Sequence, residues 1–183
     1  DALRIENILT FGPSKASSIL EASKSFTKEI CKLGKIPTAD AKIFFELEAA
    51  KTYLATSDFP IVIKADGLAA GKGVIIADSK KKAIKAVESI FNGELDNTGN
   101  KLIIEEFIEG EELSYFVLCD GKTFLPIGSA QDHKRAFDGD SGPNTGGMGA
   151  YSPAPILTTE LEEKIQSKII KPTIDIMNHK GLP

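Results

Sequence analysis

The sequence has few of the residues that characterise secreted or membrane-embedded proteins. It contains two cysteines, Cys31 and Cys119, no tryptophan and two histidines among 183 residues. The cysteines lie far apart and lack the spacing of metal ligands, which argues against a disulfide framework or a zinc site and favours a reducing compartment. No run of about 18 apolar residues is present, which argues against a membrane-spanning helix.

Strong charge of one sign and a disorder-prone composition are also missing. The net charge of −4 argues against a broad nucleic-acid surface. With 42% hydrophobic and 26% charged residues, the chain falls in the globular class. Its length corresponds to one domain or slightly more. The first residues, from Asp1 to Arg4, do not form a signal peptide and lack an initiator methionine, so we expect a piece of a longer protein.

Apolar runs bounded by turn residues predict six strands. They cover residues 7–11, 61–63, 74–77, 102–107, 113–119 and 123–130. The pair Gly12-Pro13 closes the first strand, and Asp120-Gly121 is a hairpin signal between the last two. Residues 131–156 are so rich in glycine and proline that we expect no regular structure there.

Helical spacing predicts helices between these strands. They begin near Ser14, Ser23, Phe44, Ser79 and Thr159. In the second helix Phe26, Ile30 and Leu33 share one face, and in the last helix Ile165, Ile169 and Ile170 are expected to face inward, with a kink at Pro172. The order of elements predicts an α+β fold in which antiparallel strands are flanked by helices.

The segment from Gly67 to Gly73, between two predicted strands, is rich in glycine, with one lysine inside it and another shortly before it. Glycines let a backbone approach an anion closely, and Lys64 and Lys72 add positive charge. The spacing excludes a Walker A loop, because Gly73 stands where Ser or Thr is required, and Ile76 breaks a G-x-G-x-x-G fingerprint. A phosphate-covering flap fits these residues, and a plain hairpin connection is the alternative.

Two further stretches have a chemical character. In the first, an apolar strand runs into the acidic stretch Glu105–Glu112. The backbone of residues 106–108 could bind the edge of an adenine, and a carboxylate after Gly110 could bind ribose. A solvated acidic turn is the alternative. In the second, Lys134-Arg135 suits a phosphate and residues 142–153 form a long glycine-rich loop. A mobile surface loop is the alternative there, with His133 an ordinary exposed histidine.

Together the three stretches resemble the ATP-grasp superfamily, and in detail the phosphoribosylamine–glycine ligase (GAR synthetase) family. Residues 61–74 are similar to its glycine flap, and residues 131–135 and 142–155 to its substrate loop; 23–24, 105–112 and 171–173 also fit. The resemblance covers nearly the whole chain. It implies a partial ATP-grasp fold: α+β, with antiparallel sheets flanked by helices and a glycine-rich flap between two strands.

The resemblance also implies a reaction. ATP, glycine and 5-phosphoribosylamine would give glycinamide ribonucleotide, ADP and phosphate through glycyl phosphate, a step of de novo purine biosynthesis. It implies ATP and Mg²⁺ or Mn²⁺ as cofactors, small-molecule partners only, without nucleic acid or membrane, and a cytoplasmic monomer.

The resemblance assigns site residues in two groups. The nucleotide group comprises Lys24, Lys64, Gly67, Leu68, Ala69, Ala70, Gly71, Lys72, Gly73, Glu105, Glu106, Phe107, Ile108 and Glu112. The substrate group comprises Asp132, Lys134, Arg135, Pro143, Asn144, Thr145, Gly146, Gly147, Met148 and Gly149, with Lys134, Arg135, Asn144 and Thr145 also assigned to catalysis. Lys72 is alternatively a solvated loop lysine.

By the same resemblance the chain divides into four parts. Residues 1–13 would end an N-terminal domain, 14–60 form a linker and helical part, 61–130 a nucleotide-binding subdomain, and 131–183 an incomplete second subdomain. No metal ligand is expected in this chain, because the family's Glu and Asn ligands would lie beyond Pro183, so we expect this segment alone to be inactive.

Two other interpretations stay open. The first is another ATP-grasp ligase, such as a D-alanine–D-alanine ligase or a biotin carboxylase-like enzyme; these share the flap but lack the pattern of residues 132–135 and 143–152. The second is a non-catalytic nucleotide-binding module, which the missing metal ligands favour.

Overall fold

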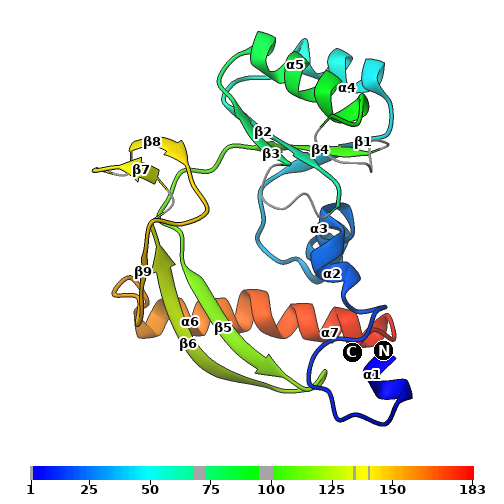
Figure 1. Cartoon of the computed structure of the whole chain (residues 1–183), viewed down its shortest axis with the longest axis vertical. Coiled ribbons are helices and arrows are strands. Elements are labelled where there is room, and N and C mark those ends of the chain that lie inside the picture. Colours follow the sequence, from blue (N-terminus) through cyan, green and yellow to red (C-terminus); the bar gives the residue numbers. More distant parts are fainter. Residues whose placement is uncertain (1, 68–72, 95–100, 134, 140) are drawn as a thin grey trace. The chain divides into compact units, whose positions relative to one another are not determined.

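A computed structural model of the chain describes residues 2–67, 73–94, 101–133, 135–139 and 141–183 (Figure 1). The chain forms two compact units, one of Asp1–Leu33 with Pro37–Ile108 and the other of Gly34–Ile36 with Glu109–Pro183. Among the described residues, no helix is long and apolar enough to cross a membrane.

The first unit contains an antiparallel sheet of four strands in the order β1-β4-β2-β3. The strands are β1 (Ala41–Phe44), β2 (Ile61–Ala65), β3 (Val74–Ala77) and β4 (Leu102–Glu106). Helices α4 (Leu47–Leu54) and α5 (Lys80–Phe91) cover one face of this sheet (Figure 1). The predicted antiparallel α+β architecture is confirmed for this unit.

The alternation of β2 places its residues on two different faces. Ile61, Ile63 and Ala65 are buried in the hydrophobic core with α4 and α5, whereas Val62 and Lys64 point to the opposite face. Helix α5 contributes Val87 and Ile90, both fully buried, at the spacing of one helical face. The core therefore leaves the second face of the sheet available for polar side chains.

The N-terminal part of the first unit holds three short helices, α1 (Ala2–Ile5), α2 (Ile19–Ala22) and α3 (Lys24–Gly34). The predicted strand over residues 7–11 is wrong, since Leu9 is 101% and Phe11 76% exposed and no described strand pairs with them. A strand needs a neighbour for its backbone groups, which apolar composition alone does not supply. In α3, Ile30 is buried as expected, but Leu33 is exposed.

The predicted helix from Phe44 to Ala55 begins too early. Phe44 ends strand β1, which pairs with β4, and the helix starts only at Leu47. The ring of Phe44 lies 5.3 Å from that of Tyr53 on α4, so its apolar side chain packs on the helix from outside. The sequence pattern is the same for a residue in the helix and for one packed against it.

The second unit is built on the hairpin of β5 (Ser114–Cys119) and β6 (Phe124–Asp132). The predicted turn is confirmed, because the Asp120 carboxylate accepts the N–H groups of Lys122 and Thr123 at 2.8 and 2.7 Å, and Gly121 has φ +88°. The prediction that residues 131–156 lack regular structure is wrong. They form β7 (Arg135–Phe137), β8 (Ser141–Asn144) and β9 (Ala150–Tyr151), pairs too short to show a periodicity in sequence.

A C-terminal helical segment completes the second unit (Figure 1). It runs from α6 (Thr159–Ile165) through a π-helical turn (Gln166–Ile170) to α7 (Lys171–His179). The π-helical turn ends two residues before Pro172, which has no N–H to continue an α-helical ladder. Ile169 is exposed rather than inward, because the wider turn shifts the helical period that the sequence pattern assumed.

Candidate nucleotide-binding site

The glycine-rich segment connects two neighbouring antiparallel strands, as predicted. Lys64 pairs with Val74, and the Ala65 N–H donates to the Gly73 carbonyl at 2.8 Å, which closes the base of the connection. Gly67 has φ +127°, a conformation that only glycine adopts without strain. The predicted flap residues Leu68, Ala69, Ala70, Gly71 and Lys72 lie outside the described residues.

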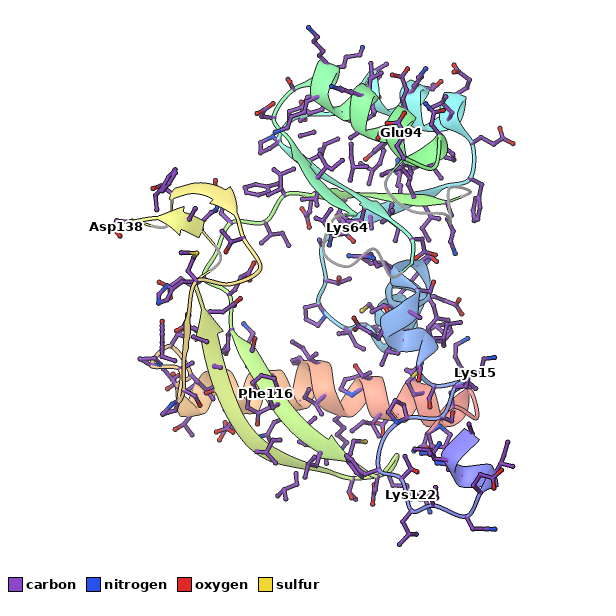
Figure 2. All side chains as sticks on the ribbon, in the orientation of Figure 1. Lys15, Lys64, Glu94, Phe116, Lys122 and Asp138 are labelled. Atoms are coloured by element: carbon purple, nitrogen blue, oxygen red, sulfur yellow. The ribbon has the colours of Figure 1, made fainter. Side chains whose placement is uncertain are left out.

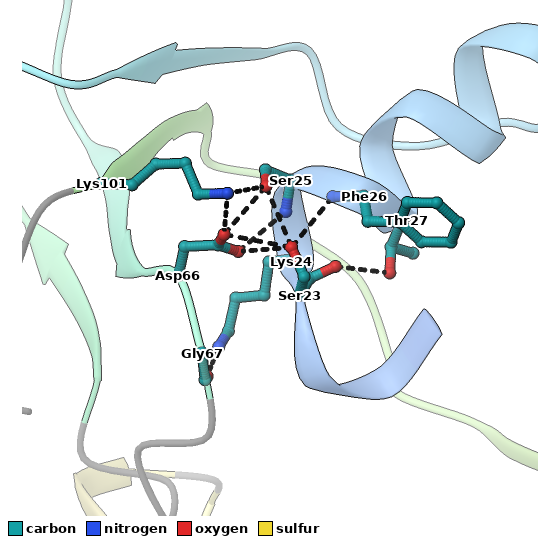
Figure 3. Close-up of polar contacts among 8 residues, drawn as sticks. All are labelled: Ser23, Lys24, Ser25, Phe26, Thr27, Asp66, Gly67 and Lys101. Atoms are coloured by element: carbon teal, nitrogen blue, oxygen red, sulfur yellow. Dashed lines mark hydrogen bonds and ion pairs between the residues drawn. The ribbon is translucent and has the colours of Figure 1, made fainter. Parts of the chain in front are cut away.

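Lys24, the first residue of α3, lies at the start of this connection. Its Nζ donates to the Gly67 carbonyl at 2.7 Å, although the two residues are 43 positions apart in sequence (Figure 3). The fold thus brings two residues of the predicted nucleotide group together. An ammonium beside a glycine backbone is a suitable environment for a phosphate.

Asp66 links the same two segments through a buried carboxylate. The side chain is 5% exposed, and it accepts the Ser25 N–H at 2.9 Å and the Ser25 hydroxyl at 2.8 Å, with Lys101 Nζ at 2.5 Å (Figure 3). Ser23 Oγ lies 3.1 Å from it as a further donor. Burial alone would raise the pKa of Asp66, but these hydrogen bonds to the charged form prevail and lower it below its usual value.

Glu105 is the centre of a second charged cluster, on the sheet face away from α4 and α5. Its carboxylate, 5% exposed, lies 2.7 Å from Lys64 Nζ and 3.2 Å from Lys28 Nζ. Because Val62 is the partner of Glu105 across the strands, Lys64 and Glu105 share one face; Figure 2 shows where Lys64 lies on the sheet. The cluster fixes the Lys64 ammonium at the end of a rigid strand.

The predicted adenine residues follow Glu105 at the end of β4. The Glu106 carboxylate accepts the Asp40 N–H at 2.8 Å, and the Glu106 N–H donates to the Asp40 carbonyl at 3.0 Å. Phe107 is half-buried and Ile108 is 61% exposed. Glu112, the predicted ribose ligand, belongs to the second unit, where its carbonyl accepts from Gln131 at 3.1 Å.

Three of the predicted substrate residues, Asp132, Met148 and Gly149, lie close together in the second unit. His133 N–H donates to the Gly149 carbonyl at 2.9 Å, and Met148 N–H donates to the His133 carbonyl at 2.7 Å, so Gly149 and Met148 lie next to the end of β6, which holds Asp132. The Arg135 guanidinium donates to the Gly142 carbonyl at 2.8 Å. His133 is exposed, as expected.

The other described substrate residues lie in β8 and in the segment that follows it. Thr145 Oγ1 accepts the Gly147 N–H at 3.0 Å, and a Cβ added at Gly146 would meet no other atom within 4 Å. Pro143 and Asn144 belong to β8. Lys134 lies outside the described residues. Within the parts of the chain that are described, no group of three or more His, Cys, Asp or Glu side chains is suited to hold a metal ion.

A family profile described as "Phosphoribosylglycinamide synthetase, ATP-grasp (A) domain" matches residues 22–183. The chain belongs to this family. The phosphoribosylamine–glycine ligase of Mesorhizobium japonicum is 54% identical over all 183 residues, which correspond to 43% of that protein. The chain therefore spans less than half the length of this relative.

Solved structures agree with the ATP-grasp fold. The crystal structure of phosphoribosylamine–glycine ligase from Thermotoga maritima aligns with a TM-score of 0.86 at 36% identity, covering 94% of this chain and 44% of that one. The biotin carboxylase domain of the Hydrogenobacter thermophilus 2-oxoglutarate carboxylase, solved with MgADP, aligns with a TM-score of 0.75 at 22% identity, over 96% of this chain and 38% of its own. The second likeness shows the shared fold only.

The structure also brings to the candidate site polar residues that are not among the predicted site residues. They are Ser25, Lys28, Asp66 and Lys101, all joined to a predicted site residue or its neighbour. Asp66 and Ser25 stand directly beside the selected Gly67 and Lys24. The sequence around Lys28 and Lys101 does not predict their contacts, because only the fold brings these lysines to Glu105 and Asp66.

Proposed function

We propose that this chain is the ATP-binding portion of a phosphoribosylamine–glycine ligase. The complete protein would use ATP to join glycine to 5-phosphoribosylamine, giving glycinamide ribonucleotide, ADP and phosphate. The observation that carries the proposal is the family match over residues 22–183, together with 54% identity over all 183 residues to a ligase of that name.

The proposed chemistry has two steps. A glycine carboxylate oxygen attacks the γ-phosphorus of ATP, ADP departs, and glycyl phosphate forms. The amine of phosphoribosylamine then attacks the acyl carbon, the amide bond forms and phosphate departs. In phosphoryl transfer the protein mainly positions groups and stabilises charge, which is the role of fixed cations and backbone N–H groups.

The first unit would bind the nucleotide. Lys24 at Gly67 and Lys64 at Glu105 supply two ammonium groups near the glycine connection, each held by a short contact of 2.7 Å. They would neutralise phosphate charge, and the glycine segment would cover the acyl phosphate and exclude water. The backbone after Glu105, through Ile108, would face adenine, and Glu112 would bind ribose.

The second unit would bind the other substrates. Arg135 offers a fork of donors suited to a phosphate, and its contact with Gly142 orients it beside the glycine-rich loop. Thr145, Gly146 and Gly147 would contribute donors at the glycine and phosphoribosylamine end, with Lys134 and Asn144.

ATP-grasp ligases use ATP with a divalent metal, and we propose Mg²⁺ or Mn²⁺ here. The described residues do not include a group of three or more His, Cys, Asp or Glu side chains that could hold such an ion. We further propose that the protein acts as a cytoplasmic monomer on small molecules.

Substrate-dependent ATP turnover by the complete protein tests the proposal. We expect ADP release that requires both glycine and 5-phosphoribosylamine. Stimulation by D-alanine, or by bicarbonate with biotin, would instead support another ATP-grasp ligase. ATP binding without turnover under any of these conditions would support a non-catalytic module.

The two lysines of the glycine segment provide a test at the level of residues. Lys64→Ala should weaken ATP binding more than Lys72→Ala, because Lys64 ends a rigid strand and is held by Glu105. Calorimetric titration of both variants of the complete protein would show it, and the reverse order would overturn the assignment of Lys64.

A further inference from the structure

Asp66 lies where two segments that the proposed function assigns to ATP meet. It directly precedes Gly67, and its carboxylate contacts Ser23 and Ser25, the two neighbours of Lys24. We propose that Asp66 is a positioning residue for nucleotide binding, which holds the Lys24 ammonium at the entrance of the glycine connection. This inference rests on the proposed function, since it explains how one of the lysines assigned to ATP is placed.

The contacts on either side of Lys24 restrict its backbone. The Ser25 N–H donates to Asp66 Oδ1 at 2.9 Å, the Ser25 hydroxyl to Oδ2 at 2.8 Å, and the Ser23 hydroxyl to Oδ2 at 3.1 Å. The first turn of α3 is therefore attached to the residue that enters the glycine connection. A side chain that starts from such an anchored backbone loses less conformational freedom when it binds a ligand.

The attachment is reciprocal. Asp66 binds the residues around Lys24, while Lys24 Nζ donates to the carbonyl of Gly67, the residue after Asp66, at 2.7 Å (Figure 3). Both contacts join residues 24–25 to residues 66–67, which lie more than 40 positions apart in sequence. The position of the Gly67 backbone thus fixes where the Lys24 ammonium lies.

The charge of Asp66 is compensated within the same cluster. Lys101 Nζ lies 2.5 Å from Asp66 Oδ2 and donates to Ser25 Oγ at 2.7 Å. A bare carboxylate near the phosphates would oppose their binding, whereas a carboxylate paired with an ammonium and buried to 5% exposure presents little net charge. Asp66 is therefore suited to hold Lys24 without repelling an anionic ligand.

A purely structural role in capping α3 explains less. Ser23 Oγ already accepts the Phe26 N–H at 3.2 Å, the contact of an ordinary N-cap. A local cap needs no carboxylate from a residue some 40 positions away. The contact between Asp66 and the helix therefore serves to join α3 to the glycine connection.

A double-mutant cycle on the complete protein tests the inference. ADP affinity is measured by calorimetry for wild type, Asp66→Asn, Lys24→Ala and the double variant. Asp66→Asn should bind ADP about tenfold more weakly, the scale of one charged hydrogen bond. Because Asp66 acts through Lys24, the double variant should bind no more weakly than Lys24→Ala alone. Asp78→Asn, which alters an exposed carboxylate of the same unit, is the matched control and should bind as wild type.

Steady-state kinetics provide a second measurement. Asp66→Asn should raise KM for ATP and leave KM for glycine unchanged, which a general loss of stability would not do. Wild-type affinity in Asp66→Asn, or losses that multiply in the double variant, would overturn the inference while leaving the proposed function intact. Failure of the wild-type protein to bind ADP or ATP would overturn the proposed function itself.

If Asp66→Asn does not fold, Ser25→Ala tests the positioning role of Asp66 instead. It removes the hydroxyl contact at 2.8 Å and keeps the backbone N–H contact at 2.9 Å. A weaker loss of ADP affinity, about two- to threefold, is expected, and it should vanish in the Lys24→Ala background. Unchanged affinity in Ser25→Ala, or a loss that persists without Lys24, would count against Asp66 as a positioning residue.

Discussion

At the scale of single residues, buried carboxylates organise the lysines of the candidate site. Asp66 and Glu105 are each 5% exposed, and each lies within 3.2 Å of at least one ammonium group. A buried charge is tolerated only when it is paired and hydrogen-bonded, and removal of one partner leaves the others uncompensated. The stability of the first unit and the geometry of its lysines therefore depend on the same contacts.

Glu105→Gln should destabilise the protein by about 1–3 kcal/mol, the range for loss of a hydrogen-bonded charge. Lys64 loses its 2.7 Å partner, while Lys28 keeps its bonds to Thr38 and Ala39 at 2.8 and 2.7 Å. A lower melting temperature would show the effect. Glu48→Gln is the control, because the Glu48 side chain is 83% exposed and its loss should change stability by less than about 0.5 kcal/mol. Equal melting temperatures for both variants would contradict the prediction.

The pH dependence of stability should reveal Asp66. Its pKa is lower in the folded state than in the unfolded chain, so its stabilising contribution is complete at neutral pH. The contribution is lost as the pH falls below about 5 and through the folded pKa. The difference in melting temperature between wild type and Asp66→Asn should therefore be largest at pH 7 and shrink toward pH 3. A difference that is constant over this range would show that the charge of Asp66 is not involved.

At the scale of elements, the caps and turns of the second unit decide where helices begin. Thr158 Oγ1 accepts the Leu161 N–H at 3.2 Å, so the N-cap lies one residue before the Thr159 that the sequence pattern suggested. The Tyr115 hydroxyl donates to Glu162 and accepts from Gln166, both at 2.8 Å, which ties strand β5 to this helix. The N-cap and the contacts with Tyr115 therefore both lie in the first turns of this helix.

Thr158→Ala should cost about 1 kcal/mol, the usual loss when an N-cap side chain is removed. Thr158→Ser keeps the accepting hydroxyl and should be close to neutral. Thr159→Ala is the matched control, and it should be neutral or slightly stabilising because alanine is the better helix former. Thermal unfolding of the three variants checks the order, and a larger loss at Thr159 would place the cap where the sequence pattern suggested.

At the scale of the whole molecule, the chain spans less than half the length of a related ligase. Its 183 residues correspond to 43% of the Mesorhizobium japonicum ligase. The chain itself forms two compact units, and the predicted nucleotide residues are divided between them, with Glu105 in one and Glu112 in the other.

We therefore expect catalysis only from the complete protein. Glycine-dependent ADP release should be absent from the isolated 183-residue chain and present in the full-length protein with Mg²⁺ or Mn²⁺. The physical reason is that a phosphoryl-transfer site needs its metal as well as its lysines to balance the charge of the transition state. Full activity of the isolated chain would show that the prediction of metal ligands outside this chain is wrong.

The glycine connection, the antiparallel strands and the family could all be predicted from sequence. These features depend on local patterns: three glycines and two lysines between two short apolar runs, and motifs that stay contiguous along the chain. Short apolar runs likewise placed β2 and β3, and the period-3.6 spacing placed α5, because each of these elements buries apolar side chains of its own in the core.

Only the tertiary structure decided which charges meet. Lys101 joins Asp66 and Ser25, and Lys28 joins Glu105, over separations that no local spacing encodes. It also decided that residues 7–11 form no strand and that residues 135–151 do form short ones, since pairing of backbone groups depends on a neighbour and not on composition. Motifs of neighbouring residues can be identified in short stretches of sequence. Ion pairs and hydrogen bonds between distant residues form only when the sheet and α3 have folded.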